Sequence, residues 1–170
     1  MNYVICYAHP HWEVYPTDIL LIRKNRPDWQ AGRYNLPGGK IEDGETIHEA
    51  ASRELFEETN IKAHHVRIIG TIEADNCIVY VCECTFDANE EAATMTDEMV
   101  FWMDVGDALR DPLLLDSLRV AIPFCFTQLS CWHIRQQTER FSTATSSQIT
   151  FEEVHAKIDV PKSFFFGPVG

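Results

Sequence analysis

Short runs of apolar and β-branched residues alternate with polar segments that contain glycine and proline along most of the 170-residue chain. Runs of this kind, bounded by turn-forming residues, are typical of β-strands. The polar segment at 75–77 separates two such runs and predicts an antiparallel hairpin. The pattern predicts strands at 4–8, 19–23, 34–39, 66–74, 78–86 and 99–103, the third of which runs into a glycine turn.

One segment between these runs carries the signals of a long helix. Thr46 and Glu49 have the spacing of a capping box, in which each residue bonds the backbone of the other. No glycine or proline follows before residue 59, so nothing interrupts a helix there. We therefore predict a helix at about 46–59.

The second half of the chain contains weaker helical signals. A short helix is expected around Asp107, and a longer one at 112–129 that Pro123 interrupts. The serine- and threonine-rich stretch 142–147 predicts a flexible linker. A small capped helix should begin at Thr150.

This order of strands and helices predicts an α+β protein, built as an α/β/α sandwich with a mixed β-sheet between helices. A hydrophobic content of 45% is enough to form the core of one domain. We expect residues 1–132 to form that domain. Residues 133–170 are expected to form a C-terminal extension, which packs on the same domain or on a partner subunit.

Composition narrows the classes of partner. The formal net charge of −12 disfavours binding to nucleic-acid backbones and to anionic membranes. No apolar run approaches the roughly 20 residues that cross a bilayer, and the N-terminus lacks the features of a signal peptide, so we expect a soluble, cytoplasmic protein. Six cysteines without C-x-x-C spacing indicate reduced and mostly buried thiols.

The predicted helix at 46–59 carries clustered carboxylates. With about 100° per residue, Glu54, Glu57 and Glu58 occupy an arc of roughly 100° on one helix face. Like charges at these spacings repel, and a carboxylate that faces the core loses its solvation. A divalent cation would offset both costs, and oxygen ligands suit Mg²⁺ or Mn²⁺. The apolar positions on or beside the arc, which place it on the core-facing half of the helix, are Ile47, Ala50, Ala51 and Leu55.

Residues 39–61 resemble the Nudix box, Gly-x5-Glu-x7-Arg-Glu-U-x-Glu-Glu-x-Gly-U, in which U is aliphatic. The preceding Leu36-Pro37-Gly38-Gly39 is similar to the lead-in common in that family. Asn60 replaces the last glycine of the box, and asparagine is the residue that best tolerates a left-handed backbone after glycine, so we expect the turn to form. The matching positions are Gly39, Glu45, Arg53, Glu54, Leu55, Glu57, Glu58 and Ile61.

The resemblance implies a Nudix fold and a metal-dependent nucleotide pyrophosphohydrolase. Carried over position by position, the ligands of Mg²⁺ or Mn²⁺ would be the Gly38 carbonyl, Glu54, Glu57 and Glu58, and these glutamates are the candidate catalytic residues. Glu98, which precedes the strand at 99–103, resembles a further ligand or base of oxidised-purine triphosphatases. Either Glu98 or Glu58 would be the general base.

Three residues of the box are expected to support it rather than to react. Arg53 projects to the flank of the helix and can pair with Glu45 at the helix entrance. That pair would hold the preceding loop, with Gly39, against the helix.

Candidate substrate contacts lie around the glycine turn. Asn35 resembles a base-reading residue of the same triphosphatases, although an asparagine that ends a strand by turn bonding explains it equally well. Tyr34 is a candidate for stacking a base, together with Trp29, and Asp116 for contacting one. The basic residues that could contact phosphate, or simply lie on the surface, are Arg23, Lys24, Arg26 and Arg33.

Four closely spaced histidines, His9, His11, His64 and His65, are a weaker signal. The sequence supplies no ordered third ligand for a transition metal. We interpret these histidines as surface loop residues.

The predicted reaction is hydrolysis of the diphosphate linkage in a nucleoside diphosphate joined to another group. We rank nucleoside triphosphates, oxidised ones included, above ADP-ribose, dinucleotides, sugar nucleotides and a capped RNA end. The rival hypothesis is a regulatory module that binds nucleotides without catalysis, yet such members usually lose box glutamates and none is lost here. A homodimer is a further expectation.

Overall fold

The computed structural model describes residues 1–150 except 14–15, 75–76, 88, 127–131 and 142–143. Its strands are β1 Asn2–Pro10, β2 Asp18–Arg23, β3 Tyr34–Asn35, β4 His65–Ala74, β5 Cys77–Phe86, β6 Met99–Asp104, β7 Trp132–Phe141 and β8 Ala144–Thr150. Its helices are α1 Ile47–Thr59, α2 Val105–Arg110 and α3 Asp116–Cys125. Within this part of the chain no helix has the length and apolar character needed to cross a membrane.

The strands form two sheets rather than the single sheet expected. One has the order β1-β5-β4-β7-β8 and mixes parallel and antiparallel pairs; the other is antiparallel, with the order β3-β2-β6. The predicted hairpin is confirmed by the antiparallel pairing of β4 with β5. The sheets separate because the free edge of β1 bonds the glycine turn, with Val4 N donating to Gly39 O (2.9 Å) and Cys6 N to Pro37 O (2.7 Å).

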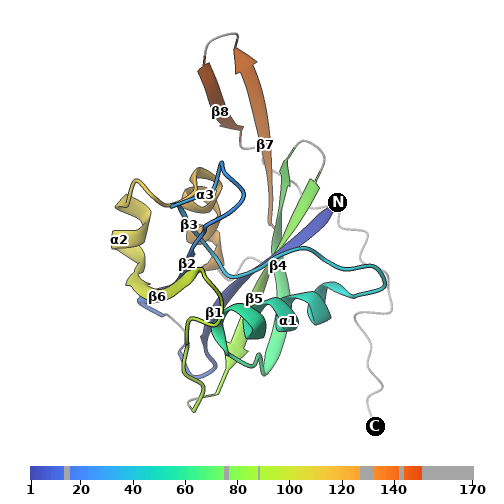
Figure 1. Cartoon of the computed structure of the whole chain (residues 1–170), viewed down its shortest axis with the longest axis vertical. Helices are drawn as coiled ribbons and strands as arrows, with labels where there is room; N and C mark the ends of the chain where they lie inside the picture. The colour runs from blue at the N-terminus through green and yellow to red at the C-terminus, as the bar shows by residue number, and fades with distance from the viewer. Residues whose placement is uncertain (14–15, 75–76, 88, 127–131, 142–143, 151–170) are drawn as a thin grey trace.

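Helices cover both faces of this β-structure, as the predicted sandwich requires. Figure 1 shows α1 lying across β1 and β5, whereas α2 and α3 lie beside the three-stranded sheet. Side chains of β1 alternate between the two layers. Val4, Cys6 and Ala8 pack beneath α1, and Ile5 and Tyr7 belong to the cluster that contains α3.

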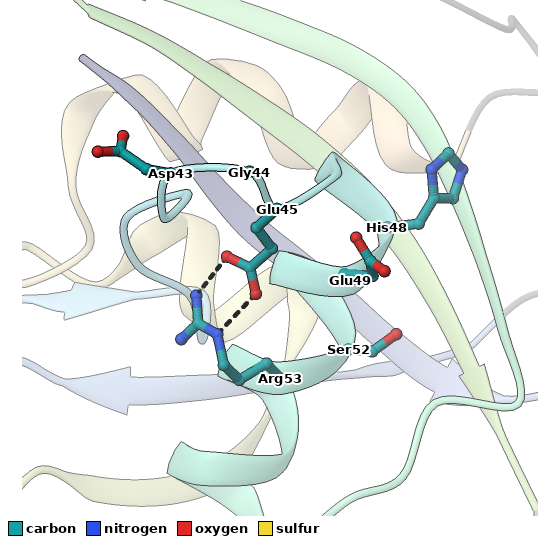
Figure 2. Close-up of a pocket in the computed structure, with 7 residues that line it drawn as sticks. All are labelled: Asp43, Gly44, Glu45, His48, Glu49, Ser52 and Arg53. Carbon is teal, nitrogen blue, oxygen red and sulfur yellow. Dashed lines mark hydrogen bonds and ion pairs between the residues drawn. The ribbon is translucent and has the colours of Figure 1, made fainter.

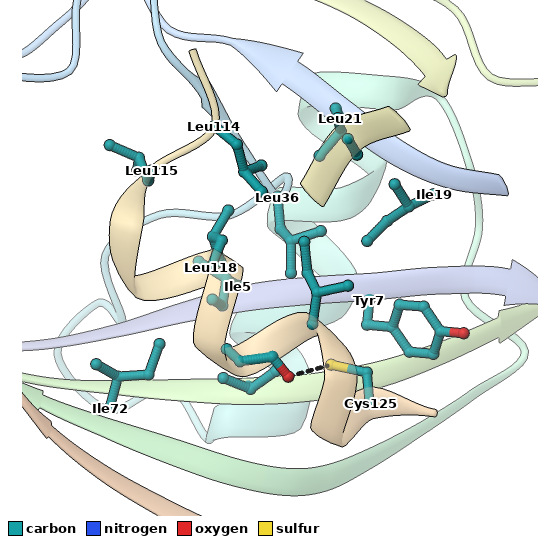
Figure 3. Packing of buried hydrophobic residues seen from close by; sticks show 14 of the residues in the cluster. Ile5, Tyr7, Ile19, Leu21, Leu36, Ile72, Leu114, Leu115, Leu118 and Cys125 are labelled. Carbon is teal, nitrogen blue, oxygen red and sulfur yellow. Dashed lines mark hydrogen bonds between the residues drawn. The ribbon is translucent and has the colours of Figure 1, made fainter. Parts of the chain in front are cut away.

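The cluster on the α3 side is the larger of the two apolar cores. Figure 3 shows Leu118 and Cys125 of α3 facing the side chains of Ile5 and Tyr7. Leu36, which directly precedes the glycine turn, lies in the same cluster and is 1% exposed. The Leu36 side chain therefore anchors the glycine turn to the core on the α3 side of the sheet, whereas the backbone of the turn faces α1.

Helix α1 begins and ends as its sequence predicts. The Thr46 hydroxyl accepts a hydrogen bond from Glu49 N, and the Glu49 carboxylate accepts one from Thr46 N, which completes the capping box. Asn60 has φ 62° and ψ 4°, and its amide donates to Phe56 O (2.9 Å). Asparagine therefore forms the left-handed turn in place of glycine.

The third helix is shorter than predicted. It starts at Asp116 rather than at residue 112, because Leu113 O and Leu115 N bond the backbone of Tyr34 in β3. The helix also continues through Pro123 to Cys125. Pro123 lies in the last turn of the helix. Proline cannot donate an amide hydrogen bond, but at this position only two more residues of the helix follow, so the disruption is small.

The prediction of a flexible linker at 142–147 is wrong for residues 144–147, because these residues belong to β8. Antiparallel pairing with β7 satisfies the backbone polar groups that a linker would expose to water. Thr150, where a small helix was expected, is the last residue of β8, and the rest of that helix falls outside the described residues. The predicted boundary after residue 132 falls at the start of β7, which pairs with β4; the division into domain and extension stays a prediction.

His9 is buried in β1 rather than exposed in a surface loop. Its Nδ1 lies 2.9 Å from Pro10 O and its Nε2 lies 3.4 Å from Glu83 Oε1. Both partners are acceptors, so only the doubly protonated ring can donate to both. Burial lowers the pKa of His9, but the hydrogen bonds to Glu83 and Pro10 outweigh it and raise the pKa above its usual 6.5.

We predict a pH-dependent contribution of this contact to stability. Because the folded-state pKa of His9 is raised, its contribution is complete below pH 6.5 and is lost as the pH rises through the folded-state pKa. The Tm difference between wild type and Glu83→Gln should therefore be larger at about pH 6 than at about pH 8.5. The lost Arg67–Glu83 ion pair contributes equally at both values, so a difference that stays constant would contradict this assignment.

A second prediction concerns the helix end. Asn60→Gly should leave the free energy of unfolding and turnover nearly unchanged, because glycine adopts this backbone without a steric cost. Asn60→Ala should cost about 1 kcal/mol, since alanine lacks the side chain that makes the left-handed region tolerable. Urea denaturation and a turnover assay measure both effects. A large loss of activity in Asn60→Gly would reveal a functional contact of the asparagine amide.

Candidate active site

Two glycines allow the turn before α1 to lie close to β1 and to the helix. Gly38 has φ 152°, and a Cβ there would lie 2.2 Å from Val4 O, so no other residue fits. Its amide donates to Glu58 Oε2 (2.8 Å). A Cβ at Gly39 would lie 2.4 Å from Glu54 Oε1. The absence of a side chain thus lets the turn lie against β1 at Gly38 and leaves room for the Glu54 carboxylate at Gly39.

The three glutamates of α1 that were predicted to bind metal differ in exposure. The Glu54 and Glu58 side chains are 14% and 11% exposed, whereas that of Glu57 is 56% exposed. The prediction that all three face the core is therefore wrong for Glu57. Residues four apart share a helix stripe, so Glu54 lies with Glu58, and Glu57 lies with Arg53 on the neighbouring stripe at the surface.

Arg53 ties the helix to the loop before it, as the sequence predicts. Its Nε and Nη2 donate to the two carboxylate oxygens of Glu45 at 2.7 and 2.8 Å, and Nη2 also donates to Lys40 O (3.1 Å). Nη1 donates to Glu54 Oε1 (2.8 Å) and Glu57 Oε2 (3.2 Å). The hydrogen bond from Arg53 lowers the pKa of Glu45 to about 2, so this carboxylate is charged at neutral pH.

Residues at the start of α1 line an open depression of about 690 Å³. Figure 2 shows two of them, Arg53 and Glu45, with the guanidinium turned toward the carboxylate. Asp43, His48 and Ser52 also line the depression. The carboxylates of Glu54, Glu57, Glu58 and Glu98 do not line this depression, so it is separate from the predicted catalytic cluster.

Glu98, which directly precedes β6, is linked to Glu58 through Lys24. It is 4% exposed, and its Oε1 accepts from Asn25 N (2.7 Å). Its Oε2 accepts from Lys24 Nζ (2.6 Å), and the same Nζ lies 3.6 Å from Glu58 Oε1. Lys24 thus joins the Glu58 carboxylate of α1 to that of Glu98 just before β6, 40 residues further along the chain.

The buried position of these carboxylates changes their acidity. Burial raises the pKa of Glu58 to about 7, although Lys24 and the Gly38 amide oppose the shift. Burial also raises the pKa of Glu54, which Arg53 opposes. Both shifts show that negative charge is costly here, so an added cation would be stabilised.

The donor set suits a divalent cation that prefers oxygen. Glu54, Glu57, Glu58 and Glu98 supply four carboxylates against the charges of Lys24 and Arg53. Among the described residues, no three acidic, histidine or cysteine side chains converge on one point as they stand. Arg53 pairs with Glu54 and Glu57, whereas Lys24 pairs with Glu58 and Glu98.

Three of the candidate substrate residues, Arg33, Tyr34 and Asp116, lie together at the start of α3. Arg33 donates to Leu114 O (2.9 Å) and lies 3.4 Å from Asp116 Oδ1, so the structure brings these two candidates together at the start of α3. Tyr34 bonds the same segment through its backbone, and its ring packs edge-on against Phe101 with centroids 5.0 Å apart. Arg33 is therefore engaged by protein atoms.

Asn35 shows the turn bonding that the sequence left open. Its Oδ1 accepts from Leu36 N (2.8 Å) and its Nδ2 donates to Gln30 Oε1 (3.2 Å). Arg23 is exposed and pairs across the sheet with Tyr34. Because side chains alternate along a strand, Arg23 projects to the face opposite Lys24. Of the basic candidates in this loop, Lys24 is the one that contacts the buried glutamates.

A family model described as the NUDIX domain matches residues 11–122, about two thirds of the chain. This chain belongs to the Nudix family. Among curated relatives, the Danio rerio "oxidized purine nucleoside triphosphate hydrolase" is 43% identical over 60 residues, which are 35% of this chain and 38% of that enzyme. The match thus spans well under half of the relative's length.

Solved structures show the same fold. A MutT protein of Bacillus halodurans superposes with a TM-score of 0.66 at 19% identity, covering 87% of this chain and 96% of that one. The bifunctional "NMN adenylyltransferase/ADP ribose pyrophosphatase complexed with AMP and MN ion" of Francisella tularensis gives 0.54 at 23% identity, covering 72% and 39%. The predicted family, α+β Nudix fold and Nudix hydrolase class are confirmed.

We predict that Glu57→Gln lowers the turnover of this Nudix hydrolase by orders of magnitude without unfolding it. Glu57 is half-exposed, so its amide analogue costs little stability, whereas a lost metal-binding charge costs catalysis. Turnover and circular dichroism measure the two effects. Glu91→Gln, an equal charge change at an exposed position, is the control. Unchanged turnover in Glu57→Gln would refute the metal-ligand assignment.

Proposed function

We propose that this Nudix hydrolase cleaves nucleoside triphosphates to a nucleoside monophosphate and pyrophosphate with Mg²⁺ or Mn²⁺. The observation that carries the proposal is the position of Glu58, whose carboxylate accepts from Gly38 N in the glycine turn and lies 3.6 Å from Lys24 Nζ. Glu54 lies beside Gly39, and Glu98 contacts the same Lys24 ammonium. Buried carboxylates from two elements, with a pKa raised at Glu58, form a site that favours a bound cation over solvent. The residues proposed to hold the cation are the Gly38 carbonyl, Glu54, Glu57, Glu58 and Glu98.

A divalent cation bound there would polarise phosphoryl oxygens and lower the pKa of a coordinated water. Either Glu58 or Glu98 would accept the proton of the attacking water, since both carboxylates are buried and contact the same Lys24 ammonium. Arg53 would not contact the substrate. It holds Glu45 and the loop before α1, and so fixes the position of Glu54 relative to Gly39.

The base would be recognised next to the turn. Tyr34 and Asn35 directly precede Leu36 and the glycines, so a nucleoside bound beside them would direct its phosphates toward the glutamates. Asp116 is 54% exposed, and together with Arg33 it offers both acceptors and donors to a base edge. The name of the Danio rerio relative supports a triphosphate, including an oxidised purine, as the substrate.

A panel of nucleotides tests this proposal. With Mg²⁺ or Mn²⁺, we expect a higher kcat/KM for dGTP or 8-oxo-dGTP than for ADP-ribose, dinucleotides, sugar nucleotides or capped RNA. The products from a triphosphate should be the monophosphate and pyrophosphate, identified by ion-exchange chromatography and phosphorus NMR. A preference for ADP-ribose, or release of orthophosphate from the triphosphate, would contradict it. EDTA should abolish turnover, and added Mg²⁺ should restore it.

A further inference from the structure

Lys24 is held in a fixed position at the end of β2. Its amide donates to Arg33 O (2.9 Å), and its carbonyl accepts from Gly32 N (2.7 Å), which closes the loop between β2 and β3. Lys24 directly follows β2, and its Nζ lies 3.6 Å from Glu58 Oε1 of α1. The lysine side chain therefore points toward α1 and is 14% exposed.

Its ammonium lies between two carboxylates that are almost excluded from water. Glu58 and Glu98 are 8% and 4% exposed, and Lys24 Nζ lies 3.6 Å from the first and 2.6 Å from the second. Two buried carboxylates this close to one point repel each other unless a positive charge lies between them. Lys24 supplies that charge from within the chain.

Arg53 plays a different part from Lys24. Its guanidinium is fixed by both oxygens of Glu45 and by Lys40 O, which lie outside the set of proposed ligands. The contacts described for the Lys24 ammonium are both with proposed ligands, and a lysine stem has four rotatable bonds. A metal ion bound to these carboxylates would therefore compete with the Lys24 ammonium for the same oxygens.

We propose that Lys24 is an internal counter-ion that competes with the divalent cation for Glu58 and Glu98. A second cation placed on the same oxygens is repelled by the ammonium, so occupancy by metal requires the lysine to move away or weakens binding. The inference rests on the proposed function, because it takes these glutamates as metal ligands. It makes Lys24 a residue that sets metal affinity rather than one that contacts the reacting phosphorus.

The test is metal binding without nucleotide. We expect Lys24→Met, which keeps the apolar stem and removes the charge, to bind Mn²⁺ about fivefold or more tightly than wild type by titration calorimetry. In EDTA its Tm should be lower than that of wild type, because the two carboxylates lose their counter-ion. The rise in Tm on adding saturating Mn²⁺ should accordingly be larger. Arg110→Met, at an exposed ion pair in α2, is the matched charge control and should match wild type in all three measurements.

The outcomes separate the two proposals. If wild type binds Mn²⁺ and Glu58→Gln weakens that binding, but Lys24→Met binds no more tightly than wild type, the counter-ion inference is overturned alone. If wild type shows no Mn²⁺ binding that depends on Glu58, the metal-dependent function and this inference fall together.

A double variant keeps the inference testable if Lys24→Met does not fold in EDTA. Lys24→Met combined with Glu98→Gln removes one positive and one negative charge from the same contact. This double variant should fold in EDTA and show a thermal transition even if Lys24→Met shows none, because the remaining carboxylate no longer faces a second one. A double variant no more stable than Lys24→Met would overturn the counter-ion role.

Discussion

The backbone hydrogen bonds between β1 and the glycine turn hold the whole site in place. Val4 N and Cys6 N donate to Gly39 O and Pro37 O, which pins the turn along an edge of β1 that would otherwise be unpaired. Gly38 is the point of closest approach, since a Cβ there would lie within 2.2 Å of the β1 backbone. Because β1 also packs beneath α1, this contact sets the distance between the turn and the helix glutamates.

Charge balance is the second constraint on the site. Packing carboxylates against a backbone turn is unfavourable unless cations accompany them. The protein distributes two cations over this cluster: Arg53 at the surface side and Lys24 at the buried side. Arg53 is part of the box and is anchored to the loop, whereas Lys24 comes from a different strand. The proposed metal site is therefore one in which protein cations and a metal ion share the same carboxylates.

The two layers of the sandwich serve different purposes. The α1 side carries the glutamates, and its apolar cluster is built from small or slender side chains such as Ala50, Ala51 and Cys6, which allow close approach of the helix. The α3 side contains the larger cluster and anchors Leu36. The start of α3 also bonds Tyr34, so a nucleoside recognised there and phosphates held by the glutamates would lie at opposite ends of one turn.

The sequence by itself determined the features that depend on local spacing. The capping box, the left-handed turn at Asn60, the pairing of Arg53 with Glu45 and the limits of α1 all follow from residues within about three helical turns of one another. For the same reason the box was sufficient to predict the family, the fold and the class of enzyme. The spacing of these residues along one helix is enough to indicate their chemistry.

Only the tertiary structure decided which charges meet. Glu57 shares the arc of Glu54 and Glu58 on a helical projection, yet it is half-exposed and pairs with Arg53. Lys24 was one of several basic residues in a loop, and its contact with Glu98 depends on the pairing of β2 with β6 across more than 70 residues of chain. The division into two sheets and the pairing of β8 likewise depend on long-range partners. Sequence periodicity records which face a residue occupies, but not the partner that the fold brings to that face.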